Sequence, residues 1–169
     1  HCKNTLISMK NILIIGAGIA GLLCATELHS GGYSVRVLDK GRGLGGRMAT
    51  RRMGAGRLDH GAQFFTVRDP RLQAYANQWL ADGVIKEWFR HAPEDSNTDG
   101  YSRYCGISGM TDVAKYLARG LDVRTSEQVL ELIRDLGQWI VRTQSGRTYV
   151  SEHLIVTAPL PQALVASWR

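Results

Sequence analysis

The chain has 169 residues, of which 44% are hydrophobic and 21% are charged, and its formal net charge is +6 at pH 7. These values are ordinary for one soluble globular domain and exclude a disordered chain, a collagen and a disulfide-rich scaffold. The longest apolar run covers residues 12–15. A membrane span needs roughly 20 residues, so we expect no membrane partner.

Three cysteines, Cys2, Cys24 and Cys105, are scattered without a C-x-x-C pair. This pattern is too sparse for a zinc site or a disulfide framework, so we expect no metal and a reducing, cytoplasmic location. Residues 1–8 lack the apolar segment of a signal peptide. We expect them to be a disordered leader before a natural start at Met9.

The positive charge raises the question of nucleic acid, because five arginines fall within residues 42–57: Arg42, Arg47, Arg51, Arg52 and Arg57. No predicted helix presents them as one stripe, and no aromatic platform accompanies them. We therefore expect no nucleic-acid partner.

The first forty residues predict a strand, a turn, a helix and a second strand. Residues 11–15 (NILII) form a buried-strand pattern, residues 19–29 are periodically apolar, and residues 33–38 (YSVRVL) alternate. Gly31 and Gly32 predict a left-handed stop for the helix. The two strands should be parallel, with a right-handed crossover between them.

Residues 40–57 are rich in glycine and arginine and are interpreted as one long functional loop. A helix should open at Pro70, with its apolar face formed by Leu72, Tyr75, Ala76, Trp79 and Leu80. We expect a short helix through residues 88–90, a polar surface loop over 91–100, and a helix over 111–119 that ends at Gly120.

From Leu121 onward the period is that of strands: residues 121–125, 128–135, 138–144 and 147–150. They predict an antiparallel meander with turns at Leu136-Gly137 and Ser145-Gly146. A further strand covers residues 153–159, and Pro161 can open a helix that runs to Arg169. Because the chain stops inside this apolar segment, we expect a truncated or fragmentary product.

The turn after the first strand carries the clearest chemistry. Gly16, Gly18 and Gly21 form G-x-G-x-x-G between a strand and a helix. The first glycine permits the tight turn, the second lets a pyrophosphate approach the backbone, and the third brings helix and strand together. Asp39 ends the second strand, where its carboxylate can accept hydrogen bonds from an adenosine ribose.

A second glycine motif, residues 43–47 (GLGGR), follows Asp39 closely. Adjacent glycines let the backbone pass close to an extended cofactor, and Arg47 can pair with a pyrophosphate. This segment favours a flavin dinucleotide over a nicotinamide one. The alternative is NADP, whose 2′-phosphate Arg42 would receive.

The G-G-R segment resembles that of flavin-containing amine oxidases. Together with LDHGAQFFTVRDPR (58–71), GISGMTDVAKYLARGLDVR (106–124) and LIVTAPLPQAL (154–164), it resembles the bacterial renalase-like branch of that superfamily. The resemblance implies an α/β fold, namely a Rossmann-like (glutathione-reductase-type) FAD-binding domain with a parallel sheet, an antiparallel β-meander and a helical insertion. It assigns residues 9–63 and 105–169 to an incomplete FAD-binding domain and residues 64–104 to a helical insertion that begins the substrate domain.

The resemblance also implies the residues that contact FAD. They comprise the glycine turn, the end of the second strand, the second glycine motif, a loop along the flavin ring, an adenine-contacting backbone position and a turn after the last strand. In that order they are Gly16, Ala17, Gly18, Ile19, Ala20 and Gly21; Asp39 and Lys40; Gly45, Gly46, Arg47 and Met48; Gly61, Ala62, Gln63 and Phe64; Val129; and Thr157 and Ala158.

By the same resemblance the reaction is hydride transfer from a small reduced substrate to FAD and then to oxygen. The substrate would be an aberrant dihydronicotinamide dinucleotide isomer or an amine, and the residues do not choose between them. His60 is a candidate for proton transfer, although a histidine beside glycine in a loop is more often structural, and the catalytic residues stay unassigned. The alternative is a dinucleotide-binding module without turnover.

Overall fold

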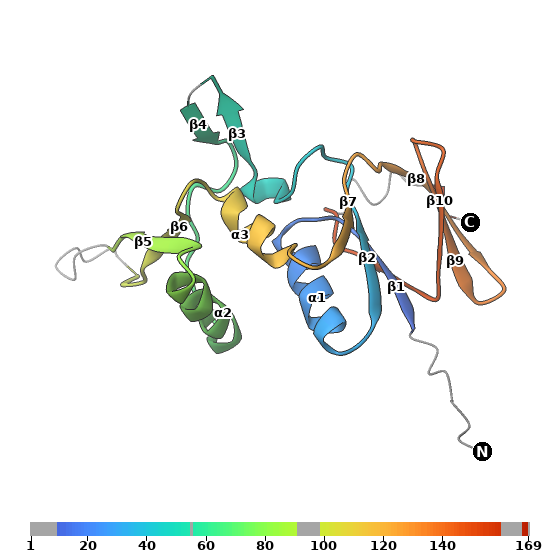
Figure 1. Ribbon diagram of the computed structural model, residues 1–169, viewed down its shortest axis with the longest axis horizontal. Coiled ribbons are helices and arrows are strands. Elements are labelled where there is room, and N and C mark those ends of the chain that lie inside the picture. The colour runs from blue at the N-terminus through green and yellow to red at the C-terminus, as the bar shows by residue number, and fades with distance from the viewer. Residues whose placement is uncertain (1–9, 55, 91–98, 160–166, 169) are drawn as a thin grey trace, which may run out of the picture. The chain divides into compact units, whose positions relative to one another are not determined.

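The computed structural model describes residues 10–54, 56–90, 99–159 and 167–168 (Figure 1). The predicted leader, most of the polar loop at 91–100 and most of the predicted C-terminal helix lie outside these ranges. The chain divides into two compact units, one formed by residues 1–42 and 120–169 and the other by residues 43–119. Each unit is described by itself.

The first unit is built on a parallel sheet with the strand order β11-β1-β2-β7. Its strands are β1 (Asn11–Ile15), β2 (Ser34–Leu38), β7 (Asp122–Arg124) and β11 (His153–Val156). Leu13 is in register with Arg36 on one side and Leu154 on the other. Because a central parallel strand is covered on both faces, the continuous apolar run of β1 is the pattern expected there.

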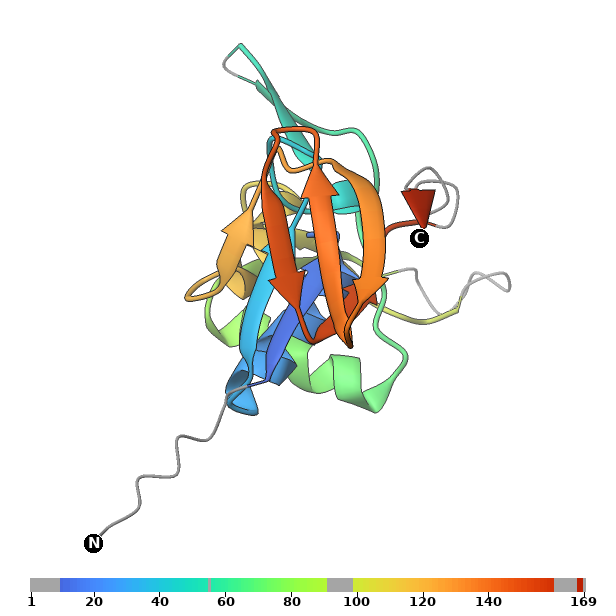
Figure 2. The same cartoon turned by 90° about the vertical axis from the view of Figure 1, so that its right-hand side faces the viewer.

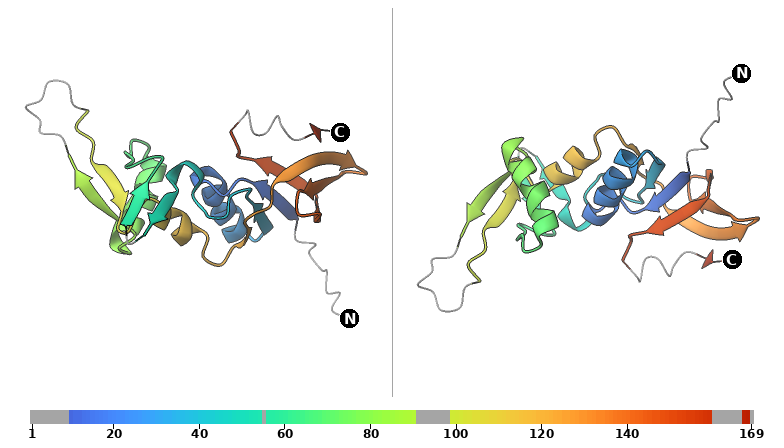
Figure 3. Two further views of the ribbon diagram at one scale, coloured as in Figure 1. Left: turned by 90° about the horizontal axis from the view of Figure 1, so that it is seen from above. Right: turned by 90° about the horizontal axis from the view of Figure 1, so that it is seen from below.

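Helix α1 (Ile19–Ser30) connects β1 to β2, as predicted, and Gly32 with φ +84° follows its end. The meander is β8 (Val129–Asp135), β9 (Gln138–Thr143) and β10 (Thr148–Ser151), which lie side by side in Figure 2. The views in Figure 3 place α1 and the meander on opposite sides of the parallel sheet. The first unit therefore has three layers.

The core between the parallel sheet and the meander is apolar. Leu13, Leu38, Leu132 and Val141 are each at most 2% exposed and pack together. They come from β1, β2, β8 and β9. This cluster fixes the meander against the strands whose ends carry the glycine turn and Asp39.

The second unit contains short elements between residues 43 and 119. They are the 3₁₀ helix η1 (Gly46–Met48), the hairpin β3 (Thr50–Met53) and β4 (Gly56–Asp59), α2 (Pro70–Ala81), the pair β5 (Ile85–Phe89) and β6 (Arg103–Gly106), and α3 (Thr111–Leu117). Helix α2 begins after Asp69, whose carboxylate accepts the Arg71 N–H at 2.8 Å. Trp79 of α2 is 1% exposed and contacts Phe65 and Tyr75.

Four predictions of local structure were wrong. Residues 40–57 do not form one long loop, because they hold η1, β3 and the start of β4. Residues 88–89 belong to strand β5 rather than to a helix. Residues 122–124 join the parallel sheet beside β2 instead of the meander. Residues 167–168 form β12 (Ser167–Trp168), paired in parallel with β8, rather than the end of a helix.

The compact units do not follow the predicted domain boundaries. The resemblance assigns residues 43–63 and 105–119 to the cofactor domain, whereas the compact second unit contains them together with the insertion. Compactness alone does not decide which segments hold a cofactor. The division into a cofactor domain and a substrate domain therefore stays a prediction.

Candidate functional site

The tight turn after β1 depends on Gly16. Its φ is +110°, and its N–H donates to the Leu38 carbonyl at 2.7 Å. A Cβ on Gly16 would lie 2.7 Å from Thr157 Oγ1, closer than real side chains approach. Thr157 follows β11, and its hydroxyl donates to the Ile15 and Gly16 carbonyls at 3.1 and 3.2 Å. The predicted turn at Thr157-Ala158 thus lies directly against the glycine turn.

The other two glycines of the motif differ from each other. A Cβ on Gly21 would lie 1.9 Å from the Gly16 carbonyl oxygen, so this glycine is needed for close helix–strand packing. Gly18 has an ordinary backbone, with φ −76° and ψ 177°, and a Cβ there would meet nothing within 4 Å. Among the described residues, none beyond its chain neighbours occupies the space in front of Gly18.

Gly18 is also the N-cap of α1, and within the part of the chain that the structure describes no side chain caps this helix. The first turn contains no acidic residue. Helix N-termini offer N–H groups and the positive end of the dipole to anions. An open face at Gly18, with Ile19 and Ala20 behind it, therefore fits a pyrophosphate, and the residues present fit a dinucleotide.

Asp39 is half-buried at the end of β2. Its carboxylate accepts the Ala17 N–H at 2.6 Å and the Gly41 N–H at 2.7 Å, one on each oxygen. A carboxylate has about four acceptor sites, so both oxygens keep capacity for a ribose hydroxyl. The acid thus joins the glycine turn to the end of β2 and still fits the predicted role. Lys40 and Arg42 beside it are exposed.

Val129 begins β8 and is half-buried against the core cluster of Leu13, Leu38, Leu132 and Val141. The register of β8 against β9 shifts just after it, between Val129 and Glu131. Its side chain therefore packs against the core as that of an ordinary strand residue does, and the adenine contact of its backbone remains a prediction.

In the second unit, the second glycine motif forms a tight turn into η1. Gly45 and Gly46 have φ of +105° and +53°, which only glycine adopts without strain. Arg47 follows within η1 and is exposed. Within the described residues its guanidinium has no hydrogen-bond or ion-pair partner. Met48 beside it is half-buried.

The loop predicted to pass along the flavin is attached to Arg47 through the backbone. The Ala62 N–H donates to the Arg47 carbonyl at 2.9 Å. A Cβ on Gly61 would lie 2.0 Å from the same oxygen. Gln63 is exposed, and Phe64 is 39% exposed beside Trp88 and Phe89. Two predicted contact segments, Gly45–Met48 and Gly61–Phe64, are therefore adjacent.

Sequence reasoning missed the polar residues that hold these two segments. The Thr50 N–H donates to Thr111 Oγ1 at 2.5 Å, and the Thr111 N–H donates to Thr50 Oγ1 at 3.1 Å. The Thr50 hydroxyl donates to Asp59, which also accepts the Met110 N–H at 3.1 Å. Thr111 Oγ1 donates to the Met48 carbonyl at 3.3 Å. These pairs are up to 63 positions apart, so no local pattern could reveal them.

His60 has a structural partner. Its Nδ1 lies 2.8 Å from the Ala49 carbonyl oxygen, and since a carbonyl only accepts, Nδ1 carries the proton. This bond closes the base of the β3–β4 hairpin. The structural interpretation of His60 accounts for its position, and the structure assigns it no proton-transfer partner among the described residues.

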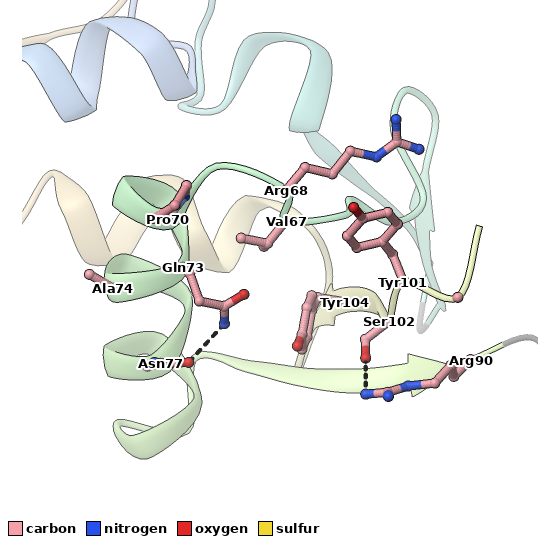
Figure 4. Close-up of a pocket in the computed structure, with 11 residues that line it drawn as sticks. Val67, Arg68, Pro70, Gln73, Ala74, Asn77, Arg90, Tyr101, Ser102 and Tyr104 are labelled. Carbon is pink, nitrogen blue, oxygen red and sulfur yellow. Dashed lines mark hydrogen bonds between the residues drawn. The ribbon is translucent and has the colours of Figure 1, made fainter.

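The second unit also has an open cleft of about 590 Å³ between α2 and the β5–β6 pair (Figure 4). Gln73 donates to Asn77 at 2.8 Å and Arg90 donates to Ser102 at 2.5 Å within it. Tyr101 and Tyr104 form its aromatic wall. None of the predicted cofactor-contacting residues lines this cleft.

The thiols at Cys24 and Cys105 are unpaired and half-buried, and burial raises the pKa of each. They stay protonated at neutral pH and lack nucleophilic character. Over the described ranges, no group of three or more His, Cys, Asp and Glu side chains is placed to hold a metal. No described helix is long and apolar enough to cross a bilayer.

Two family models match consecutive parts of the chain. Residues 14–79 match an NAD(P)-binding Rossmann-like domain, and residues 88–166 match flavin containing amine oxidoreductase. Renalase from Mus musculus is 28% identical over 167 residues, covering 92% of this chain and 49% of the mouse protein. Together these matches support a place for the chain in the flavin amine oxidase superfamily. The cofactor that these matches indicate is FAD.

Further relatives agree with this placement. A flavin-dependent L-tryptophan oxidase from Lentzea aerocolonigenes is 49% identical over 110 residues, which are 64% of this chain and 23% of the oxidase. A solved triple mutant of putrescine oxidase superimposes with a TM-score of 0.74 at 15% identity, covering 94% of this chain and 60% of its own. This structural likeness confirms the predicted fold class. The chain spans about half the length of the mouse renalase it matches.

Proposed function

We propose that this chain binds FAD and forms the cofactor-binding part of an oxidoreductase that transfers hydride from a small reduced substrate. The observation that carries the proposal is the open space at Gly18. Neither the backbone angles nor the neighbouring atoms of the described residues require glycine there. A ligand that approaches the backbone gives the glycine a reason.

Different residues of the chain would each contact a particular part of the cofactor. The N–H groups at the start of α1 would receive the pyrophosphate, and Asp39 would accept a ribose hydroxyl with its remaining acceptor sites. Arg47 would add a charge-assisted bond to a phosphate. Gly61, Ala62, Gln63 and Phe64 would lie along the ring, and Val129 would meet the adenine through its backbone.

When bound, FAD would supply the hydride acceptance, with oxygen as the final acceptor of the electron pair. The substrate classes proposed are aberrant dihydronicotinamide dinucleotide isomers and amines. We rank the dinucleotide isomers first because the sequence resembles the renalase-like branch of the superfamily. Residues 64–104 would begin the domain that faces the substrate.

The test is direct binding to the purified chain. FAD should bind and its fluorescence should change, while NADP at the same concentration should not displace it. Binding of NADP in preference to FAD would favour the alternative, in which Arg42 receives a 2′-phosphate. Failure to bind either dinucleotide, by a chain whose circular dichroism shows the expected mixed structure, would overturn the proposal.

The ranking of the two substrate classes needs a separate measurement on the chain loaded with FAD. Anaerobic mixing with a dihydronicotinamide isomer should bleach the flavin absorbance, and admission of oxygen should restore it. Bleaching by simple amines alone would reverse the ranking. FAD binding without bleaching by either class would leave a binding module without turnover, which is the second candidate function.

A further inference from the structure

Glu127 is a buried carboxylate with no place in the proposed cofactor contacts. Glu127 is 2% exposed, and it is the only charged residue buried to this degree in the described part of the chain. Glutamate is almost never fully buried unless it is paired. The position therefore requires an explanation.

The Glu127 side chain is tied to the segment that joins β9 to β10. Ser145 Oγ donates to one carboxylate oxygen at 2.7 Å, and Arg147 forms an ion pair with the other. Hydrogen bonds from Thr143, Ser145 and Arg147 lower the pKa of Glu127 despite its burial. The carboxylate is thus fixed as an anion within the meander.

The Glu127 backbone is tied to Asp39. Its N–H donates to the Asp39 carbonyl at 2.8 Å. Ser126, which has the rare positive φ of +59°, donates its N–H to the Gly41 carbonyl at 2.8 Å. The Asp39 N–H in turn donates to the Arg124 carbonyl at 2.8 Å. Three main-chain bonds from residues 124–127 therefore hold residues 39–41.

We propose that Glu127 is a positioning residue for the adenosine end of the bound cofactor. Its side chain anchors residues 124–127 to the β9–β10 segment, and its backbone fixes the carbonyl of Asp39. The Asp39 carboxylate then meets the Ala17 N–H at 2.6 Å in the glycine turn. The inference rests on the proposed binding of FAD and names a residue that acts through Asp39.

The same segment leads directly into Val129, the position expected to meet adenine. Glu127 therefore lies between the acid expected to bind the ribose and the backbone expected to bind the base. Removing the anchor that Glu127 provides should disturb recognition of adenosine. ADP carries the adenosine and the pyrophosphate without the flavin, so its affinity reports on this half of the cofactor.

The experiment compares variants of the whole 169-residue chain for binding of FAD and of ADP by calorimetry. Glu127→Gln keeps the shape and one acceptor while removing the charge, and Ser145→Ala removes one donor to the carboxylate. Both should weaken FAD and ADP by a similar factor, about tenfold for Glu127→Gln. Glu131→Gln is the matched control, because it removes the 2.8 Å ion pair with Arg142 on the same hairpin.

A role in general stability is separated from positioning by a double-mutant cycle. If Glu127 acts through Asp39, Glu127→Gln should change ADP affinity less than about twofold in the Asp39→Ala background. An equal loss in both backgrounds, or binding by Glu127→Gln within about twofold of the parent, would overturn the inference. If Glu127→Gln does not fold, Ser145→Ala in the two backgrounds decides by the same criteria.

The outcomes also separate this inference from the proposed function. Absence of FAD and ADP binding by the parent chain removes the proposed function and the inference with it. Normal binding by the parent, with the Glu127 and Ser145 variants indistinguishable from the Glu131 control, removes the inference alone.

Discussion

Gly18 and Gly21 lie three residues apart in one motif, and alanine at each should impair a different property of the protein. Gly21→Ala places a methyl 1.9 Å from the Gly16 carbonyl oxygen, whereas carbon and oxygen in contact are ordinarily about 3.3–3.6 Å apart. Gly18→Ala places its methyl where no atom of the described residues, apart from its chain neighbours, lies within 4 Å. The first substitution should damage the fold, and the second should damage binding.

The magnitudes follow from the surroundings. Overpacking costs about 1–3 kcal/mol, and the backbone carbonyl at Gly21 cannot rotate away as a side chain could, so we expect the upper end. Alanine is a better helix former than glycine by about 1 kcal/mol, which leaves a net loss of about 2 kcal/mol. At about 2–4 °C per kcal/mol for a chain of this size, Tm should fall by about 4–8 °C.

Gly18→Ala replaces a helix N-cap, which costs about 1 kcal/mol or less. Its Tm should fall by no more than about 4 °C, while FAD affinity should fall by at least tenfold, about 1.4 kcal/mol. Differential scanning fluorimetry gives Tm without ligand, and flavin fluorescence titration gives Kd. If Gly18→Ala binds FAD as tightly as the parent, the open space does not receive the cofactor. Equal Tm values for the two variants would refute the packing role of Gly21.

Three further outcomes are expected. Arg47→Ala should lose about 1.5–3 kcal/mol of FAD binding, a roughly ten- to hundredfold weaker Kd by titration, and Arg47→Lys should recover part of it because lysine lacks the planar fork. Asp39→Asn should weaken FAD binding less than Asp39→Ala. It should also lower Tm in thermal melts, because the NH2 group of asparagine would face a main-chain N–H that donates to the aspartate carboxylate in the parent. Asp99 has its pKa lowered to about 2, first by the hydrogen bond from Arg103, so its stabilisation is present above its ordinary pKa of 3.8 and is lost as pH falls through about 2. Asp99→Asn should therefore lower Tm at pH 7 and have a shrinking effect between pH 4 and pH 2.

The elements that the sequence predicted well have strong local patterns. The apolar run of β1, the turn residues before β9 and the Asp69-Pro70 start of α2 each fix an element through neighbours in the chain. Leu136-Gly137, for example, has φ of +42° and +80°, as a tight hairpin turn requires. Patterns of this kind need no information from distant residues.

The elements that were missed lack such a pattern. Strands β3 and β4 expose much of their surface, with Met53 at 66% and Leu58 at 52%, so their sequence shows no alternation of buried and exposed residues. Lys86 and Glu87 in β5 favour helix by propensity, and pairing with β6 overrides it. Strand β7 has only three residues, and its place is set by pairing with β2 across more than eighty positions.

The candidate site shows the same division between local and non-local information. The glycine motifs could be read from spacing alone, and so could the acid that ends β2. The residues that support those motifs could not be identified in this way, because Thr50 and Thr111 meet across 61 positions and Glu127 reaches Asp39 through one main-chain hydrogen bond. Spacing locates the residues expected to touch a ligand, whereas the residues that hold them in place come from distant parts of the chain.

The strength of each motif residue as evidence for a ligand depends on whether the fold already needs it. Asp39 bonds two main-chain N–H groups, and Gly16 and Gly21 are required by a positive φ and by close packing, so the fold accounts for all three without a ligand. Gly18 is different, because serine, aspartate or asparagine would cap α1 at least as well. Their side chains would occupy the N–H groups that an anion needs. The glycine that the fold does not require is therefore the residue that argues most strongly for a bound dinucleotide.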